Sequence, residues 1–479
     1  MSQSPNIRHA FSWKLAERLF AQVGQFVVQI ILARKLSPDL FGTLAITTAI
    51  ANLAALFVQS GISTAIVRKE TLTNDDVKTA ITLSFGFSAV LYLAVFLFSP
   101  MVEQFYAFAG LSSYLRWTAL ILFPGAATAV FTGVLEREMN FKALFFRSIF
   151  SVAVSGVVGI VMAYNGMGIW ALIAQLLINQ LLTAAILWIS CGWKLQFGIS
   201  KASFQAIYRF SSKIVVLSLL SQVCSSIRSL VIGKKYDADS LAYFDKGNTY
   251  SYYLYTLIDS SVSRVLLPVL AKKQDDMDGL KTMLRRAISL NAFVSCPVLV
   301  GFAVVARPFI SLVLTDVWAA CEVYFTIFAA VRLFMIMRGL LTQAFYAIGN
   351  SGFVLKLQIV DTIATVAVLL VTIPIGVEAI AIGMIVTEVF CYVYLASGAR
   401  KAVQYRFREQ LGDVAKPILA ALGMYAVAWP LNNWISAPFV LLIVQILVGG
   451  LAYVLLSVLL RNEDLRFLWN QLRRKNGTG

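Results

Sequence analysis

The sequence predicts an all-helical protein that crosses a membrane about fourteen times. Of its 479 residues, 59% are hydrophobic and only 13% are charged, and the mean hydropathy is +0.78. Water-soluble domains do not reach such values. The apolar runs are about twenty residues long, the length that a helix needs to cross a hydrocarbon core of roughly 30 Å.

The predicted spans follow one another along the whole chain with short connections. The first seven occupy residues 12–33, 41–66, 79–99, 113–133, 144–164, 168–190 and 210–232. The next seven occupy residues 243–268, 287–306, 317–337, 353–374, 378–398, 415–435 and 439–460. Because no connection is long enough for a soluble domain, we expect the protein to act within the membrane or at its surface.

The distribution of positive charge predicts the orientation. The net charge is +16, and most Lys and Arg residues lie near the ends of spans. With an even number of spans both termini share a side, and placing them in the cytoplasm puts most of the cations in or beside cytoplasmic loops. The basic excess is therefore a topology signal and a contact with membrane lipids, and we expect no nucleic-acid partner.

Signatures of catalysis and of metal binding are missing from the sequence. There is no GxxxxGK[ST] phosphate loop, and no long external loop with clustered carboxylates such as membrane glycosyltransferases use. His9 is the single histidine, and none of the five cysteines forms a CxxC pair. We expect no metal, no cofactor and no enzymatic activity.

An internal repeat appears when the chain is compared with itself at a shift of 200 residues. Span, loop and charge positions coincide from the first span to the start of the third. Identical pairs include Ser12 and Ser212, Leu19 and Leu219, Gln22 and Gln222, Val23 and Val223, Lys35 and Lys235, Asp39 and Asp239, and Asp76 and Asp276. An even number of spans in each copy predicts two lobes in the same orientation, related by an axis along the membrane normal. We expect a six-helix lobe over 1–200, a second over 201–410, and two extra helices with a basic cytoplasmic tail over 411–479.

Five segments carry a family resemblance. They are LARKLSPDLFG (32–42), GISTAIVRKE (61–70), VLEREMNFKAL (134–144), YNGMGIWAL (164–172) and QAFYAIGNSG (343–352). In their order and spacing the sequence resembles the polysaccharide transporter branch of the multidrug/oligosaccharidyl-lipid/polysaccharide exporter superfamily, the Wzx-type flippases. The resemblance covers nearly the whole chain and is greatest to exporters of exopolysaccharide units such as colanic acid. It implies a MATE-like fold of two six-helix bundles, an undecaprenyl-diphosphate-linked oligosaccharide as substrate, and a location in the bacterial inner membrane.

A cavity for such a substrate needs cations for the diphosphate and amide, hydroxyl or aromatic groups for the sugars, so polar residues within spans are the candidates. On the first span, Arg18, Gln22, Gln25 and Gln29 are spaced four, three and four apart and share one helical stripe. The repeat pairs Gln22 with Gln222. These side chains line a cavity, which we favour, or they hydrogen-bond a neighbouring helix.

The eighth span contains an unusual group of aromatic and polar residues. In it Asn248, Tyr252, Tyr255 and Asp259 follow one another four, three and four residues apart. Tyrosine rings that stack on sugars and carry a hydroxyl suit a glycan cavity. The alternative, an aromatic belt at the membrane surface, does not explain a tyrosine as deep as Tyr255.

Three arginines lie within predicted spans. Arg228, Arg264 and Arg332 are the candidates for the diphosphate, because a guanidinium makes paired, charge-assisted hydrogen bonds with phosphate oxygens. The alternative for Arg264 and Arg332 is snorkelling to headgroups from a nearby helix end. The alternative for Arg228 is an ion pair with Asp259 or with another acid.

Three acids also lie within predicted spans, at Asp259, Asp361 and Glu388. A carboxylate in a span needs either a proton or a cationic partner. Each is therefore a candidate for coupling to protons or sodium, and each has structural pairing as its alternative.

Taken together, these features predict a flippase that moves a lipid-linked oligosaccharide by alternating access for polysaccharide biosynthesis. Two alternatives stay open at this point: a multidrug or cation antiporter of the same superfamily, and a non-transporting scaffold of a polysaccharide assembly complex. A polysaccharide polymerase and chain-length or export machinery are the expected protein partners.

Overall fold

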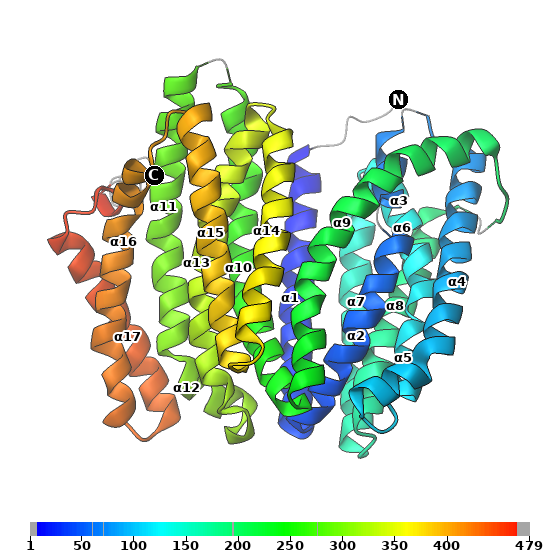
Figure 1. The fold of residues 1–479 in the computed structure, drawn as a ribbon, viewed down its shortest axis with the longest axis horizontal. Helices are drawn as coiled ribbons and strands as arrows, with labels where there is room; N and C mark the ends of the chain where they lie inside the picture. Colours follow the sequence, from blue (N-terminus) through cyan, green and yellow to red (C-terminus); the bar gives the residue numbers. More distant parts are fainter. Residues whose placement is uncertain (1–6, 60, 70, 194–195, 275, 467–479) are drawn as a thin grey trace. The chain divides into compact units, whose positions relative to one another are not determined.

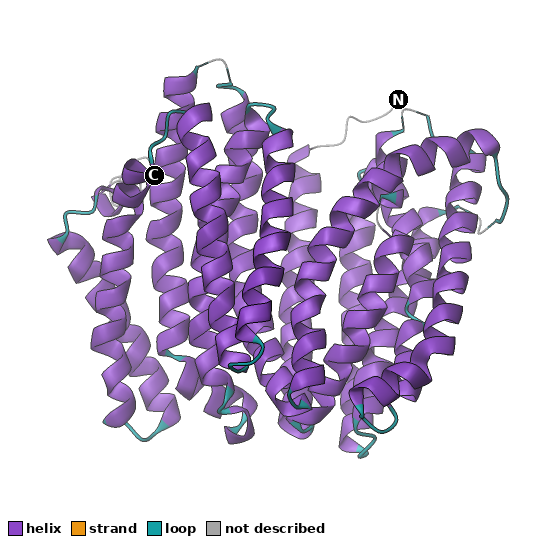
Figure 2. Cartoon of the chain, in the orientation of Figure 1, coloured by secondary structure: helices purple, strands orange, loops and turns teal. Residues whose placement is uncertain are grey.

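The computed structural model describes residues 7–59, 61–69, 71–193, 196–274 and 276–466. Within three helices the description leaves out the side chains of residues 7–12, 15, 206–214, 216, 217, 220 and 260–265. Every regular element of these described residues is helical (Figure 2). The prediction of an all-helical protein is confirmed for this part of the chain.

The helices follow one another with short links (Figure 1). The first ten are α1 (Ile7–Lys35), α2 (Pro38–Gln59), α3 (Ile62–Arg68), α4 (Asn74–Tyr106), α5 (Leu111–Ala119), α6 (Leu122–Arg137), α7 (Phe141–Tyr164), α8 (Ile169–Cys191), α9 (Lys201–Lys235) and α10 (Ala238–Ala271). They are followed by α11 (Met277–Val304), α12 (Ala306–Phe309), the π-helix η1 (Ile310–Leu314), the 3₁₀-helix η2 (Asp316–Trp318) and α13 (Cys321–Ala347). The last are α14 (Ser351–Thr372), α15 (Val377–Ala402), α16 (Phe407–Ala428), the 3₁₀-helix η3 (Trp429–Asn433) and α17 (Pro438–Leu459).

Among the described residues, 11 helical segments are long and apolar enough to cross a membrane. The remaining three predicted spans fall on α1, α9 and α10, which are 29, 35 and 34 residues long and contain the side chains left out above. A multi-pass membrane protein is thereby confirmed, and the total of fourteen crossings stays a prediction.

Two predicted spans are broken into consecutive helices. Gly61, with a φ of 83°, separates α2 from α3, and this left-handed conformation favours glycine. Pro124 lies in the first turn of α6, where its missing N–H leaves no helical hydrogen bond unmade. Both breaks divide a predicted span without removing it.

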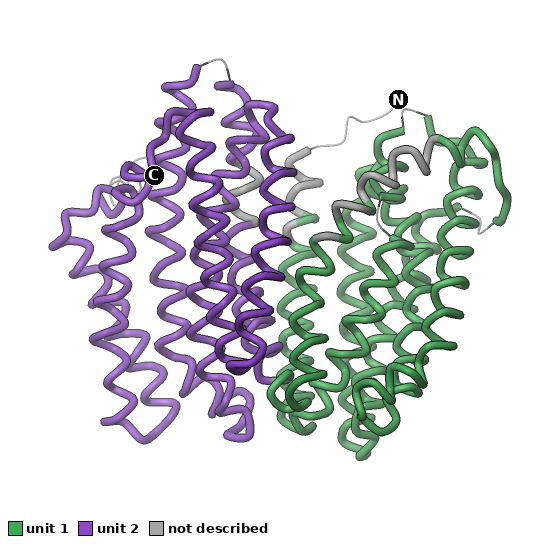
Figure 3. The backbone as a smooth tube through the Cα atoms, viewed as in Figure 1, with its two compact units in different colours: residues 1–242 green, residues 243–479 purple. Residues whose placement is uncertain are grey.

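Contacts divide the chain into two compact units, residues 1–242 and residues 243–479 (Figure 3). In the first unit α1 packs along α7, α7 along α8, and α3 against α6. In the same unit α9 packs against α2 and α4. Because α9 therefore belongs to the first unit, the boundary between the two units lies after Ala242. The domain boundaries predicted from the repeat, at 200 and 410, stay a prediction.

In the second unit α11 packs against α13 and α16, and α15 against α13 and α14. Ion pairs join α11 to α16: Lys281 lies 2.8 Å from Glu409, and Arg285 lies 2.7 Å from Asp413. Between α15 and α16, the Tyr405 hydroxyl donates to Asp413 over 2.7 Å. Burial and this hydrogen bond both raise the pKa of Tyr405, so its hydroxyl remains a donor at neutral pH.

The same local geometry occurs at the start of α7 and of α14. In each, an asparagine caps the helix, Asn140 accepting from the amide of Ala143 and Asn350 from that of Phe353. In each, a left-handed residue precedes the asparagine, Met139 with a φ of 56° and Gly349 with a φ of 75°. The two segments, both quoted above for the family resemblance, therefore share a backbone turn as well as a position between helices.

The crossing of α2 with the start of α10, within the first unit, leaves no room for a side chain. A Cβ added to Gly42 would lie 1.9 Å from the carbonyl oxygen of Ala238 and 2.6 Å from its carbonyl carbon. At the same junction, a Cβ on Gly233 would lie 2.7 Å from the side chain of Ile46. Because the contact to Gly42 is made by backbone, the neighbour has no flexible atoms with which to make space.

We expect Gly42→Ala to separate the two backbones at this crossing and to lower both folded yield and the thermal unfolding midpoint of the purified protein in detergent. The matched control is Gly86→Ala in α4, where an added Cβ meets nothing within 4 Å. That control should be neutral or stabilising by up to about 1 kcal/mol, because alanine is the better helix former. Equal midpoints for the two variants would contradict the proposed close approach.

Candidate functional site

The predicted stripe on α1 lies away from the side of that helix that packs against α7. The side of α1 that packs against α7 carries Val28. A Cβ added to Gly156 of α7 would lie 2.4 Å from the side chain of Val28. At 100° per residue, Arg18, Gln22, Gln25 and Gln29 lie about a quarter of a turn from Val28. They lie nearly opposite the exposed apolar side chains Phe20, Val23 and Val27.

The three glutamines are half-buried, whereas Arg18 is exposed. One end of α1 is fixed to α7 by Glu17, which lies 2.7 Å from Arg147 and accepts from Ser148 over 3.1 Å. The contact with α7 and the exposed apolar residues thus occupy two sides of α1. The stripe lies on a third side.

On α9, the structure describes two of the predicted residues. Gln222 donates to the hydroxyl of Ser226 over 3.0 Å, and both belong to the same helix. Arg228 donates over 3.2 Å to the carbonyl of Cys224, one turn earlier. These bonds hold both side chains along the surface of α9.

Arg332 is a buried cation between α13 and α10, with 4% of the residue exposed. Its guanidinium donates to the hydroxyl of Ser251 over 3.3 Å, to the carbonyl of Asn248 over 3.1 Å, and to the side-chain oxygen of Asn248. It also lies over the ring of Tyr252, 5.3 Å from the centroid. Snorkelling needs a nearby helix end, whereas Arg332 is buried and lies fifteen residues before the end of α13 at Ala347.

Two predicted tyrosines lie beside this cation on α10. The rings of Tyr252 and Tyr255 are 5.6 Å apart, and Tyr252 remains 46% exposed. Tyr255 is half-buried, and its surroundings include the charges of Asp259, Arg332 and Arg338. Asp259 lies beside α13, where a Cβ on Gly339 would be 3.4 Å from its Oδ1. The α10 stripe therefore adjoins two arginines of α13.

The second of these arginines, Arg338, joins three helices. It lies 2.8 Å from Asp361 of α14 and 3.2 Å from Glu388 of α15, and 19% of its side chain is exposed. Arg338 lies about a third of a turn around α13 from Arg332, so one helix presents cations to two different neighbours. Structural pairing, the alternative for Asp361 and Glu388, is thus present, and ion coupling by these acids stays a prediction.

Within the second unit the structure brings together Tyr252, Tyr255, Asp259, Arg332, Asp361 and Glu388 through α10, α13, α14 and α15. The side chain of Arg264 lies outside the described residues, so this prediction is not tested. Sequence reasoning missed Arg338, because it ended the predicted span at residue 337, whereas α13 continues for ten more residues to Ala347. The signal that could have found it is the presence of Asp361 and Glu388 on the two following spans, because two carboxylates within spans need a cation.

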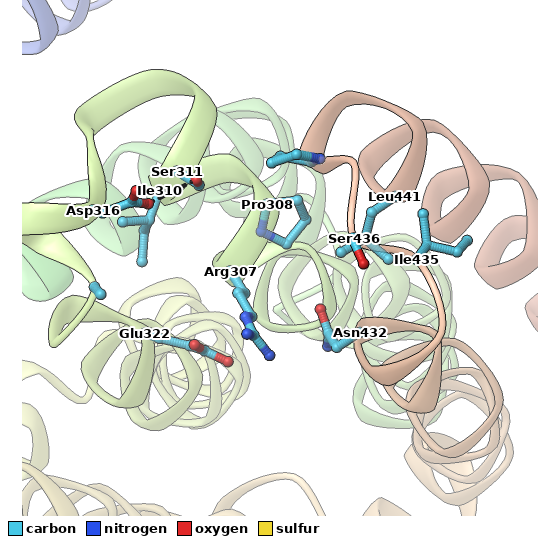
Figure 4. A pocket seen from close by; sticks show the side chains of 12 residues that line it. Arg307, Pro308, Ile310, Ser311, Asp316, Glu322, Asn432, Ile435, Ser436 and Leu441 are labelled. Atoms are coloured by element: carbon cyan, nitrogen blue, oxygen red, sulfur yellow. Dashed lines mark hydrogen bonds between the residues drawn. The ribbon is translucent and has the colours of Figure 1, made fainter.

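A pocket of about 440 Å³ lies elsewhere in the second unit, between the α12–η2 segment, the start of α13 and the start of α17 (Figure 4). Its polar lining comes from Arg307, Ser311, Asp316, Glu322, Asn432 and Ser436. None of the predicted site residues lines it. Among the residues that the structure describes, no three His, Cys, Asp or Glu side chains are grouped to hold a metal ion.

A family model described as "Polysaccharide biosynthesis protein" matches residues 31–323, which is more than half of the chain. The chain belongs to this family. Two relatives of this chain are the succinoglycan biosynthesis transport protein ExoT of Rhizobium meliloti (strain 1021), 22% identical over 295 residues, and the lipopolysaccharide biosynthesis protein WzxC of Escherichia coli (strain K12), 22% identical over 306 residues. Each match covers 62% of this chain, and it spans 60% and 61% of the respective relatives.

Solved structures share the fold of this chain. The lipid II flippase MurJ in an inward closed conformation has a TM-score of 0.77 at 17% identity, covering 94% of this chain and 99% of MurJ. An inward-facing multidrug resistance MATE family transporter of the MOP superfamily has a TM-score of 0.62 at 15% identity, covering 82% and 98%. The resemblance to the polysaccharide transporter branch of this superfamily is confirmed.

We expect Arg338→Met to destabilise the second unit, because it leaves two carboxylates buried without their cation. Removing one partner of a buried ion pair costs about 3–5 kcal/mol, which should appear as a lowered thermal unfolding midpoint in detergent. Adding Asp361→Asn and Glu388→Gln to Arg338→Met should recover most of the loss. A single Arg338→Met variant as stable as the parent would contradict this account.

Proposed function

We propose that this protein is a flippase that moves undecaprenyl-diphosphate-linked oligosaccharide units across the bacterial inner membrane for polysaccharide biosynthesis. The polymer is an exopolysaccharide, an O-antigen or a capsule. Transport proceeds by alternating access and involves no covalent chemistry. The membership of a polysaccharide biosynthesis family and the fold shared with a lipid II flippase support this proposal.

The observation that carries the proposal is the buried guanidinium of Arg332 beside the Tyr252 ring. Hydrogen bonds to the Ser251 hydroxyl and to the carbonyl and side-chain oxygens of Asn248 orient this cation. A guanidinium stays charged at physiological pH, and its planar fork matches phosphate oxygens. Tyrosine rings at the same place offer surfaces on which sugars stack.

The other substrate contacts follow from the polar stripes. Arg228 and Arg264 complete the cationic set for the diphosphate. Sugar hydroxyls bind the amides of the α1 stripe and of Gln222, together with Tyr252 and Tyr255. Arg18 belongs to the same stripe and, being exposed, is accessible to an anionic headgroup. Asp259, Asp361 and Glu388 are the proposed sites of coupling to protons or sodium.

The proposed architecture has fourteen crossings, with two six-helix lobes over 1–200 and 201–410 in parallel repeat and two additional helices over 411–479. Both termini are cytoplasmic. Support comes from the 200-residue correspondence of the sequence, from the matching caps at Asn140 and Asn350, and from the bias of Lys and Arg toward one side. A polysaccharide polymerase and chain-length or export machinery are the proposed partners.

The cationic contacts can be tested by replacing Arg228, Arg264 and Arg332 with alanine, singly and together, in a strain that depends on this protein for surface polysaccharide. We expect inserted variants to lose export and to accumulate lipid-linked oligosaccharide, because the diphosphate loses its paired donors. Arg408→Ala, an exposed arginine at the start of α16, is the control and should export normally.

Normal insertion with full export by all three arginine variants would overturn the cationic-cavity proposal. Export of cationic dyes without an effect on surface polysaccharide would instead favour a multidrug antiporter. Full export by variants of the α1 stripe and of Tyr252 and Tyr255 would favour a non-transporting scaffold.

Sugar contact by Tyr252 predicts that Tyr252→Leu slows export roughly fivefold, because a stacked ring contributes on the order of 1 kcal/mol. Tyr252→Phe keeps the ring and should retain most of the rate. Tyr346→Leu is the matched control, since this tyrosine of α13 is also 46% exposed and lies outside the stripe. An equal loss in Tyr252→Leu and Tyr346→Leu would argue against a glycan contact.

A further inference from the structure

A second pocket of the second unit, of about 450 Å³, lies where α17 ends. It is lined by Val454, Ser457, Val458, Arg461, Asn462, Leu465 and Arg466. Its residues belong to the last two turns of α17 and to the segment that follows. The bias of positive charge assigns this end of α17 to the cytoplasmic surface of the membrane.

The polar end of this pocket offers hydrogen-bond donors. Arg461 and Arg466 are exposed and carry guanidinium groups, which donate and never accept. Asn462 is 3% exposed, and its side-chain oxygen already accepts from the amide of Asp464 over 3.0 Å. Its side-chain nitrogen has no hydrogen-bond partner within the described residues. A ligand that supplies oxygen acceptors satisfies all three side chains.

No acid lines the pocket, and of the two acids that follow Asn462 in the chain, Glu463 is exposed and Asp464 is paired. Asp464 is 1% exposed, lies 3.0 Å from Arg286, and accepts from the hydroxyl of Ser289. Lys416 donates over 3.3 Å to the carbonyl of Arg461, so a cation also covers the last carbonyls of this segment. The net charge at the pocket is therefore positive, which favours an anion.

The opposite end of the pocket is apolar and open to the surroundings. Val454 and Val458 lie one turn apart on α17 and are 47% and 56% exposed. They belong to the most apolar of the crossing segments, with a mean hydropathy of 2.6. The pocket thus has apolar side chains at the end nearer the membrane interior and hydrogen-bond donors at the end nearer the surface. A phospholipid has the matching arrangement, with acyl chains inside and a phosphate at the surface.

We infer that this pocket binds an anionic phospholipid, with the phosphate at Arg461, Arg466 and Asn462 and an acyl chain along Val454 and Val458. The site is separate from the proposed substrate contacts of α10 and α13. Its role is independent of the flippase proposal, because membrane lipid surrounds the protein whatever it transports.

The experiment measures binding of palmitoyl-oleoyl phosphatidylglycerol to the purified full-length protein in detergent by native mass spectrometry. We expect Arg461→Ala combined with Arg466→Ala to weaken retention roughly tenfold or more, since each basic residue near a membrane surface contributes roughly fivefold. Asn462→Leu should weaken it further. The matched control, Arg400→Ala with Lys401→Ala, removes two exposed cations from the end of α15 and should leave retention unchanged.

Competitors distinguish the sources of phosphate. Neither inorganic phosphate nor phosphatidylcholine should displace the bound phosphatidylglycerol at equal concentration, because the first has no acyl chain and the second has no net negative charge. Undisturbed retention in the double variant would overturn the inference, as would an equal loss in the Arg400 and Lys401 control. Preferential displacement by undecaprenyl diphosphate would also overturn it, because the pocket would then belong to the transported lipid.

Unfolding midpoints of the lipid-free variants distinguish loss of binding from loss of folding. We expect these midpoints to equal that of the parent.

Discussion

The pairing of Arg338 with Asp361 and Glu388 is the interaction on which the arrangement of the second unit depends. A charge within a membrane-crossing helix has no water to solvate it, so its partners must come from the protein. Three helices, α13, α14 and α15, are thereby committed to one another at a single level. The position of α13 then decides where Arg332 stands, and with it the surroundings of Tyr252.

The two arginines of α13 illustrate two ways of keeping a buried cation. Arg338 is held by opposite charges, which neutralise it and fix it in place. Arg332 is oriented by a hydroxyl, an amide and carbonyl oxygens together with an aromatic ring. The two residues therefore have different surroundings although they share a helix.

The sequence predicted the helical class and the approximate position of the 11 segments that are long and apolar enough to cross a membrane, because hydrophobicity over twenty residues is a strong local signal. It also placed Tyr252, Tyr255 and Asp259 on one stripe, which follows from helical periodicity alone. Partners on other helices are not local properties, so the joining of Asp361 and Glu388 through Arg338 was not predicted. The same holds for Gly42, since nothing in its neighbours announces that the backbone of Ala238 lies against it.

The matching turns at Asn140 and Asn350 show that the two halves of the chain differ in length. Lys35 and Lys235 end α1 and α9 and are 200 residues apart, whereas the two capping asparagines are 210 apart. The links differ most between α11 and α13, which are joined by residues 305–320, whereas residues 107–110 join α4 and α5. Part of the longer link forms a wall of the pocket at Arg307, so the chain gains a pocket at the place where its second half is longer.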